Sequence, residues 1–207
     1  MKSKLKNILS DQLPGEDIHL EVTPLGRMRS SEAKQQSSLI KPSAVAVLLY
    51  QQHGEWYTLL TERPIYPGNH SGQISFPGGK YESEDEILLH TSIRECHEEV
   101  AFKPDTSQLI GKLTDVFIPH SHFHIEPYLF LIDQQTPNFQ KNDREVASLI
   151  QLPISHLIDQ KNLIFTQQKG LRDTLLDQVP TFTFQHYEIW GATALILNEV
   201  KHIWKQL

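Results

Sequence analysis

The sequence has a single cysteine, Cys96, among its 207 residues. A lone cysteine excludes an internal disulfide and fits a reducing compartment. The chain also lacks an apolar run long enough to span a bilayer, and no signal-peptide stretch follows the basic residues 1–6. We therefore expect a cytoplasmic protein with no membrane partner. The last residues, Lys205-Gln206-Leu207, have only a faint likeness to a peroxisomal address.

Positive charge is also scarce, with 19 Lys and Arg against 25 Asp and Glu and a formal net charge of -6. Nucleic acids and anionic membranes need clustered positive charge, so we expect neither as a partner. The hydrophobic content of 39% and charged content of 21% are those of an ordinary globular protein. Acidic residues gathered in one pocket could instead hold divalent cations.

Hydrophobic periodicity predicts a short N-terminal helix through Leu5, Ile8 and Leu9, and a polar loop at 28–39. We expect residues 1–40 to form this helix-and-linker extension and residues 41–207 to form the main domain. The main domain should start with a hairpin of strands at 43–50 and 56–61, followed by a long loop rich in Gly and Pro at 64–80.

A helix is predicted next, with Ser83 as N-cap and Glu86 completing a capping box. The remaining pattern predicts a final helix at about 191–206. Further expected elements are strands at 110–118, 125–132, 145–151 and 181–189, and a short helix at 153–158. This order indicates an α/β fold (α+β in some schemes), with a mixed β-sheet between helical layers.

The helix after residue 83 carries three closely spaced glutamates. At about 100° per residue, Glu95, Glu98 and Glu99 cluster roughly 130° from an apolar face. That face consists of Leu89, Ile93, Cys96 and Val100. Neighbouring carboxylates repel by about 0.2–0.5 kcal/mol per pair, and a divalent cation such as magnesium relieves that repulsion. Spacing alone is more often typical of a solvated acidic face.

The order of residues goes further. Phe76-Pro77-Gly78-Gly79-Lys80, then Glu86, then Arg94-Glu95-Cys96-His97-Glu98-Glu99 resembles the Nudix box, Gly-x5-Glu-x7-Arg-Glu-U-x-Glu-Glu-x-Gly-U, where U is apolar. The resemblance implies the Nudix fold and a hydrolase. Two departures are visible: the loop is one residue longer than the basic pattern, and Ala101 replaces the last glycine.

Carried over by position, the resemblance implies that Glu95, Glu98 and Glu99 bind magnesium or manganese. It implies that Arg94 and Glu86 form the pair that orients them. Asp143-Arg144-Glu145-Val146 resembles the loop that often brings a further acid to the metal, which here would be Glu145, with Asp143 as the fallback.

A wider resemblance, over about residues 43 to 200, is to the coenzyme A pyrophosphatase branch. Leu59-Leu60-Thr61-Glu62-Arg63 and Gly72-Gln73-Ile74-Ser75-Phe76-Pro77-Gly78-Gly79 match its signature, and 189–194 resembles its C-terminal segment. Pro64 replaces a small residue, and Gly68 replaces a second arginine that could bind phosphate. The implied substrate-binding residues are Arg63, Gly72, Gln73, Phe76, Gly78 and Gly79.

The resemblance implies hydrolysis of a diphosphate linkage, turning coenzyme A or acyl-CoA into 3′,5′-ADP and the (acyl-)4′-phosphopantetheine. Glu98, Glu95 or Glu145 would accept the proton of the attacking water. Homodimerisation is a further implication. Three alternatives stay open: another substrate such as ADP-ribose or NADH, a non-catalytic nucleotide sensor of the same fold, and an isopentenyl diphosphate isomerase-like enzyme. The last needs an active-site cysteine, and Cys96 lies on the apolar face.

Three alternating histidines, His120, His122 and His124, would share one face of a strand, which is compatible with zinc or a substrate contact. Because no cysteine or acid completes the set, we expect a polar strand face instead.

Overall fold

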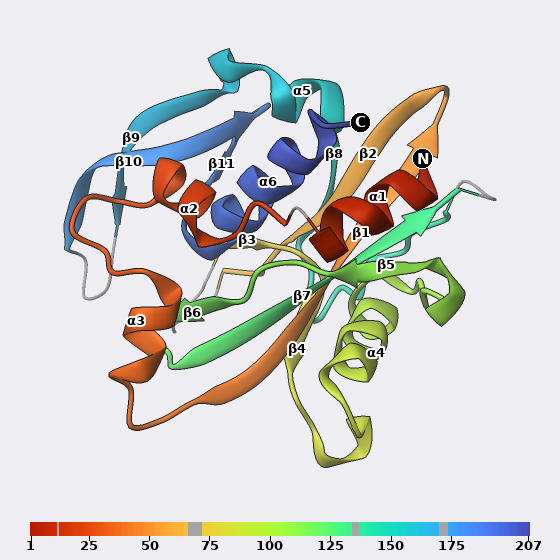
Figure 1. Ribbon diagram of the computed structural model, residues 1–207, viewed down its shortest axis with the longest axis horizontal. Helices are drawn as coiled ribbons and strands as arrows, with labels where there is room; N and C mark the ends of the chain where they lie inside the picture. Colours follow the sequence, from red (N-terminus) through yellow and green to blue (C-terminus); the bar gives the residue numbers. More distant parts are fainter. Residues whose placement is uncertain (12, 66–71, 134–136, 170–173) are drawn as a thin grey trace.

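The computed structural model describes residues 1–11, 13–65, 72–133, 137–169 and 174–207 (Figure 1). Across these ranges, no helix is both long and apolar enough to cross a membrane.

A mixed sheet forms the centre of the molecule. Its strands are β1 (Lys41–Gln52), β2 (Glu55–Glu62), β3 (Ile74–Ser75), β4 (Gly78–Lys80), β5 (Leu109–Lys112), β6 (Val116–Ile118), β7 (Phe123–Ile132) and β8 (Ser148–Pro153). The spatial order is β3-β2-β1-β7-β5, with β4 also paired to β1, β6 to β7 and β8 to β2. β1 and β7 run parallel, whereas β1 is antiparallel to both β2 and β4.

A smaller antiparallel sheet has the order β11-β10-β9. Its strands are β9 (Leu163–Lys169), β10 (Leu175–Phe184) and β11 (Tyr187–Ile189). The single strand expected at 181–189 is therefore wrong. A turn in which Gln185 has φ 54° divides it into the end of β10 and all of β11.

Six α-helices are described: α1 (Lys2–Asp11), α2 (Glu16–His19), α3 (Ser30–Gln35), α4 (Leu88–Val100), α5 (Ile154–Ile158) and α6 (Gly191–Trp204). Short 3-10 turns lie at Leu20–Val22, Ser83–Asp85, Thr106–Gln108 and Gln160–Asn162. α3 lies inside the segment expected to be a loop. The helix expected from Ser83 begins only at Leu88, after a 3-10 turn.

Alternation along β1 explains the layers. Ala46, Leu48 and Tyr50 point to one face of the sheet and pack with Ile93 and Cys96 of α4. The opposite face packs against α6 and α1, which lie on one side of the sheet in Figure 1. The expected mixed sheet between helices is thus confirmed.

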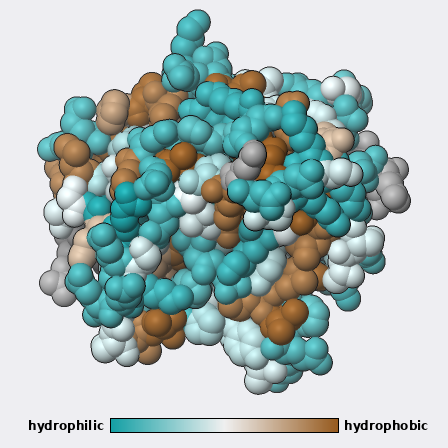
Figure 2. All heavy atoms as spheres, viewed as in Figure 1, coloured by the Kyte–Doolittle hydropathy of each residue, from teal (hydrophilic) through white to brown (hydrophobic). Residues whose placement is uncertain are grey.

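Most other expected elements are found, with shifted ends. The first hairpin, the short helix α5 and the final helix agree with their predicted ranges. The strand expected at 110–118 is two strands, β5 and β6, and the one expected near 145–151 begins at Ser148. On the face viewed in Figure 2, hydrophobic atoms form separate patches among hydrophilic ones.

The N-terminal helix contributes to the main core, since Leu5 and Ile8 of α1 are 0% and 4% exposed within the cluster that includes α6. The expected boundary at residue 40, between an N-terminal extension and the main domain, stays a prediction.

We expect Leu5→Ala to lower the free energy of unfolding by about 2–5 kcal/mol, because it removes a fully buried side chain. Leu25→Ala is the matched control: Leu25 is 92% exposed, and its change should stay within about 0.5 kcal/mol. Chemical denaturation measures both. Equal, small effects would contradict a structural role for α1.

Candidate active site

A tight turn precedes α4 and sets its position. Glu82 is the N-cap of the 3-10 turn Ser83–Asp85, and the Asp85 side chain accepts from the backbone of Glu82 in return. The capping box expected from Ser83 and Glu86 is therefore wrong by one residue at each end. At the other end of α4, Ala101 takes the left-handed conformation that a glycine adopts more easily (φ 54°, ψ 24°).

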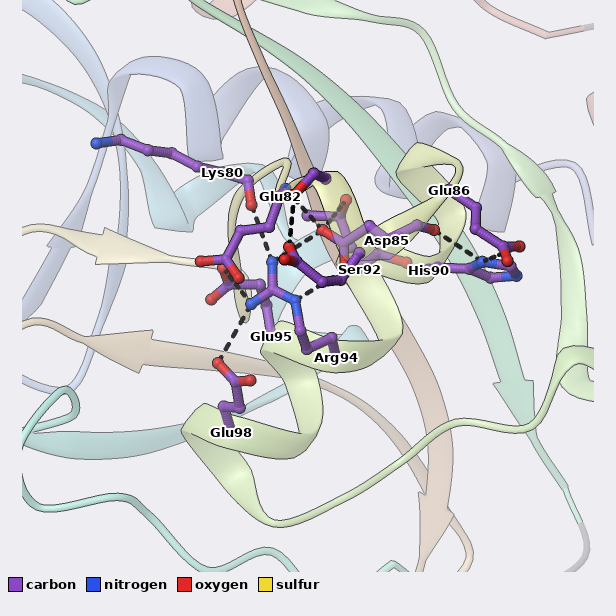
Figure 3. Close-up of polar contacts among 12 residues, drawn as sticks. Lys80, Glu82, Asp85, Glu86, His90, Ser92, Arg94, Glu95 and Glu98 are labelled. Carbon is purple, nitrogen blue, oxygen red and sulfur yellow. Dashed lines mark hydrogen bonds and ion pairs between the residues drawn. The ribbon is translucent and has the colours of Figure 1, made fainter.

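Arg94 is the hub of the site (Figure 3). Its Nε and Nη2 donate to the two carboxylate oxygens of Asp85 at 2.8 and 3.0 Å, and Nη2 also donates to the carbonyl of Lys80 at 3.0 Å. Its Nη1 donates to Glu95 at 3.0 Å and to Glu98 at 3.2 Å. A guanidinium has five N–H donors, so every one is used.

Asp85, not Glu86, is the acid that supports Arg94, so the expected Arg94–Glu86 pair is wrong. The Asp85 side chain is 3% exposed, and it also accepts a hydrogen bond from Thr91 at 2.8 Å. Arg94 holds the pKa of Asp85 far below its usual range. Glu86 is 81% exposed, and its carboxylate lies 3.7 Å from His90 (Figure 3).

A signal for Asp85 was present in the sequence. Counting forward from Gly79, five residues separate it from Asp85, as in the Gly-x5-Glu part of the box. Counting back from Arg94 leads instead to Glu86. The extra residue lies after the acid, in the stretch where Glu86 itself takes φ 60° and connects the 3-10 turn to α4.

The three glutamates of α4 do not share one solvated face. Glu98 has a side chain that is 48% exposed and Glu95 one that is 14% exposed, whereas Glu99 is 4% exposed and turned toward the sheet. Glu99 lies 3.5 Å from the hydroxyl of Thr61 at the end of β2, and Gly78 N–H donates to its carboxylate. Thr61 was not predicted as a site residue.

The paired glycines of β4 permit this packing. A Cβ at Gly79 would lie 2.3 Å from Glu95 Oε1, and one at Gly78 would lie 2.4 Å from the carbonyl oxygen of Ala44. Neither glycine has a positive φ, so no strained turn requires them. Close approach to Glu95 and to β1 explains both, and their approach to phosphates stays a prediction.

A loop after β7 brings a fourth acid. Asn142 N–H donates to the carbonyl of Glu99 at 2.9 Å, and Ala147 N–H donates to the carbonyl of Glu62 at 2.8 Å. This anchored loop holds Glu145 close enough to raise the pKa of both Glu95 and Glu99. Asp143, the fallback acid, is 83% exposed and pairs with Lys141.

The gathered carboxylates suit a divalent cation. Burial raises the pKa of Glu99 to about 8, with Arg63 opposing the shift and Glu95 and Glu145 adding to it. Burial also raises the pKa of Glu95. Two acids that resist ionisation would be stabilised in their charged forms by a bound cation, and oxygen ligands favour magnesium or manganese.

Three of the expected substrate-binding residues, Arg63, Gly72 and Gln73, lie between β2 and β3, whereas Phe76 lies in the core. Arg63 follows β2, and its N–H donates to Gln73 O at 3.0 Å. Its positive charge acts to lower the pKa of Glu99. Gln73 is exposed, and Gly72 has φ 65° and donates to Pro64 O at 3.3 Å. Phe76 is 1% exposed within the core, so its expected substrate contact is wrong. Gly68 lies outside the described residues.

Cys96 is 0% exposed, and burial raises the pKa of its thiol, which agrees with its expected place in the core.

The expected polar strand face of His120, His122 and His124 is wrong, since only His124 of the three lies in β7. Acids do reach it: His124 Nε2 lies 2.9 Å from Asp115, near Glu126. Lys112 and Lys34 already neutralise this cluster, Lys112 at 3.0 Å from Asp115 and Lys34 Nζ at 3.0 Å from His124 Nε2.

We expect Asp85→Asn to lower the free energy of unfolding by about 3 kcal/mol at neutral pH, because it leaves the Arg94 charge without its partner. Glu86→Gln, one residue away and exposed, should change it by less than about 0.5 kcal/mol. Because the pKa of folded Asp85 is lowered, its stabilisation is present above the unfolded pKa and is lost as pH falls through the folded pKa.

Urea denaturation from pH 7 to pH 3 measures these differences. The difference in the free energy of unfolding between wild type and Asp85→Asn should become smaller as the pH falls. A larger loss in Glu86→Gln than in Asp85→Asn would sink the assignment of Asp85.

Comparisons with known proteins agree with this geometry. The profile of the NUDIX domain matches residues 40–173, more than half of the chain. The chain is 32% identical over 142 residues to an uncharacterised Nudix hydrolase, NudL, of Yersinia pestis (strain Pestoides F), covering 69% of each chain. NudL of Yersinia pseudotuberculosis serotype O:1b (strain IP 31758) matches with the same values.

Solved structures show the same fold at low identity. A MutT/nudix family protein from Enterococcus faecalis has a TM-score of 0.55 at 13% identity, covering 99% of this chain and 75% of its own. The Nudix hydrolase RenU of M. smegmatis has a TM-score of 0.52 at 15% identity, covering 90% and 94%. The chain belongs to the Nudix family, and it is a pyrophosphohydrolase that acts on nucleoside diphosphate derivatives.

Proposed function

We propose that the protein hydrolyses the diphosphate linkage of coenzyme A or acyl-CoA, with magnesium or manganese bound by Glu95, Glu98, Glu99 and Glu145. The observation that carries the hydrolase centre is the convergence of these four acids from α4 and from the 142–147 loop. The metal would polarise the diphosphate oxygens and activate the attacking water.

The chain's own residues divide the remaining work. Arg94 and Asp85 orient Glu95 and Glu98, since one guanidinium binds all three acids. Glu98 is the most exposed acid of α4 in this group, which makes it our choice as the acceptor of the water proton, with Glu95 and Glu145 as the alternatives. Placement of this kind, with little covalent chemistry, is what diphosphate hydrolysis requires.

Support for coenzyme A comes from how the two parts of its signature meet. Thr61 pairs with Ser75 and Glu62 with Ile74 across β2 and β3, and Arg63 N–H donates to Gln73 O. The pairing brings Arg63 beside the Glu99 carboxylate, where its guanidinium would bind a substrate phosphate. A cytoplasmic location, expected from the sequence, and a homodimer, implied by the family resemblance, complete the proposal.

A substrate panel tests the proposal: coenzyme A, acyl-CoA, ADP-ribose, NADH and dinucleoside polyphosphates, each with magnesium and with manganese. We expect release of 3′,5′-ADP from coenzyme A at the highest kcat/KM. Glu98→Gln should lower kcat by at least about 100-fold, because it removes a metal ligand or base. Glu86→Gln is the matched control and should keep its kcat.

Binding of nucleotides with no turnover of any of them would contradict the enzyme and favour a sensor. Turnover of ADP-ribose or NADH above that of coenzyme A would keep the hydrolase and overturn its substrate.

The Glu99→Gln variant tests the metal ligands without substrate. At neutral pH this change should raise the melting temperature of the metal-free protein, because Glu99 is ionised in the unfolded chain and must take up a proton or bury its charge on folding. Metal at about 100 times its dissociation constant stabilises a protein by about 2.7 kcal/mol, and this gain should be lost in the variant. Differential scanning calorimetry with EDTA and with magnesium measures both. An unchanged response to magnesium would remove Glu99 from the metal site.

A further inference from the structure

A polar cavity lies between the N-terminal segment and α6, on the opposite side of the sheet from α4. Its polar lining comes from His19, Thr23, Arg27, Arg29, Ser30 and one acid, Glu16, and Leu195 of α6 contributes an apolar wall. It has about 220 Å³ of empty space, part of which is open to solvent. None of the residues assigned to hydrolysis lines it.

His19 is buried in this wall with its hydrogen-bonding capacity unused. Its exposed fraction is 3%, and neither ring nitrogen forms a hydrogen bond within the described part of the chain. Nε2 lies 3.4 Å from a carboxylate oxygen of Glu199, which is 0% exposed. On the other side of the ring, Nδ1 has no hydrogen-bond partner among the described residues. An unsatisfied buried polar group costs about 1–3 kcal/mol, so a ligand that accepts from it is favoured.

Arg27 adds a cation that lacks a counter-ion. Its only hydrogen bond to a described residue runs from Nη2 to Phe117 O at 3.3 Å, and no described carboxylate lies within ion-pair distance. Four of its five N–H donors therefore remain available. Burial without a neighbouring acid lowers the pKa of this guanidinium, the reverse of what the acid beside Arg94 does.

The acids near the cavity, Glu16 and Glu199, are hydrogen-bonded to other residues and do not act as the counter-ion of Arg27. Both carboxylate oxygens of Glu16 accept from Ser31, from its N–H at 2.7 Å and its hydroxyl at 2.6 Å. Glu199 accepts from the N–H and the hydroxyl of Thr114. Arg29, at the rim, pairs with Asp17.

We propose that this cavity binds a phosphate-type oxyanion, held by the Arg27 guanidinium and the His19 ring. The centre of a water-sized sphere can occupy only about 10 Å³ of this space, so one anion oxygen would enter and the others would face solvent. This size excludes a nucleotide base or a pantetheine arm. The site is separate from the hydrolytic centre, and its ligand is either free phosphate or the phosphate group of a monoester.

Inorganic phosphate is the probe, titrated into metal-free full-length protein while the melting temperature is followed. We expect phosphate, and sulfate as its analogue, to raise the melting temperature of the wild type. Arg27→Gln should weaken the apparent affinity at least tenfold and leave magnesium-dependent hydrolysis unchanged. Lys103→Gln, an exposed control of the same charge change, should respond like the wild type.

Two further variants make the result decisive. Arg63→Gln should keep its response to phosphate; loss of the response there, with retention in Arg27→Gln, would place the anion in the hydrolytic centre and overturn the proposal. If Arg27→Gln fails to fold, the NMR signals of the His19 ring, assigned with His19→Asn, should shift as phosphate is added to the wild type. No shift, or no response to either anion, would mean that the cavity holds water only.

A further titration with a nucleoside monophosphate shows whether the ligand is free phosphate or a phosphate monoester. A response that Arg27→Gln also weakens indicates a monoester, and a response to inorganic phosphate alone indicates the free ion.

Discussion

The Arg94 guanidinium is the contact on which the rest of the site depends. It joins the end of β4 through Lys80 O, the turn before α4 through Asp85, and two acids of α4 itself. Because all its donors are engaged, it cannot bind a substrate phosphate without leaving one of these partners. Its role is therefore to hold Glu95 and Glu98 in place. In our proposal, the binding of substrate charge therefore falls to another cation, Arg63, whose charge acts on Glu99.

The acids also show what the fold must tolerate. Glu99 is turned into the sheet beside β4. A side chain at Gly79 would collide with Glu95 of α4, and one at Gly78 would collide with β1, so both glycines are needed for this packing. Burial makes the charged form of Glu99 unfavourable, and Glu95 and Glu145 increase that penalty. A fold optimised for stability alone would not gather such groups. This local conflict is the physical reason to read the cluster as a cation site and not as an acidic helix face.

Local patterns in the sequence predicted what depends on local spacing. The first hairpin, the helix α4 with Cys96 on its core face, and the final helix all follow from periodicity. The one-residue choice between Asp85 and Glu86 did not, because both are acids beside the helix start and only the 3-10 turn decides which one faces Arg94. Phe76 was misassigned for a similar reason: its neighbours in the motif lie at the site, but its own ring, in the link between β3 and β4, packs in the core. Thr61 needed a contact between β2 and α4 that periodicity does not predict. Asp115 reaches His124 only because the chain turns back between β6 and β7.

The site draws on segments that are joined mainly by backbone contacts. Asn142 N–H bonds to Glu99 O, Ala147 N–H to Glu62 O, and Arg63 N–H to Gln73 O. Backbone hydrogen bonds of this kind leave the side chains free to vary. The side chains of such segments can therefore change while α4 and its acids keep their geometry. It follows that the hydrolytic chemistry rests mainly on the acids of α4, whereas the identity of the substrate depends on the segments that follow and precede Arg63 in the fold.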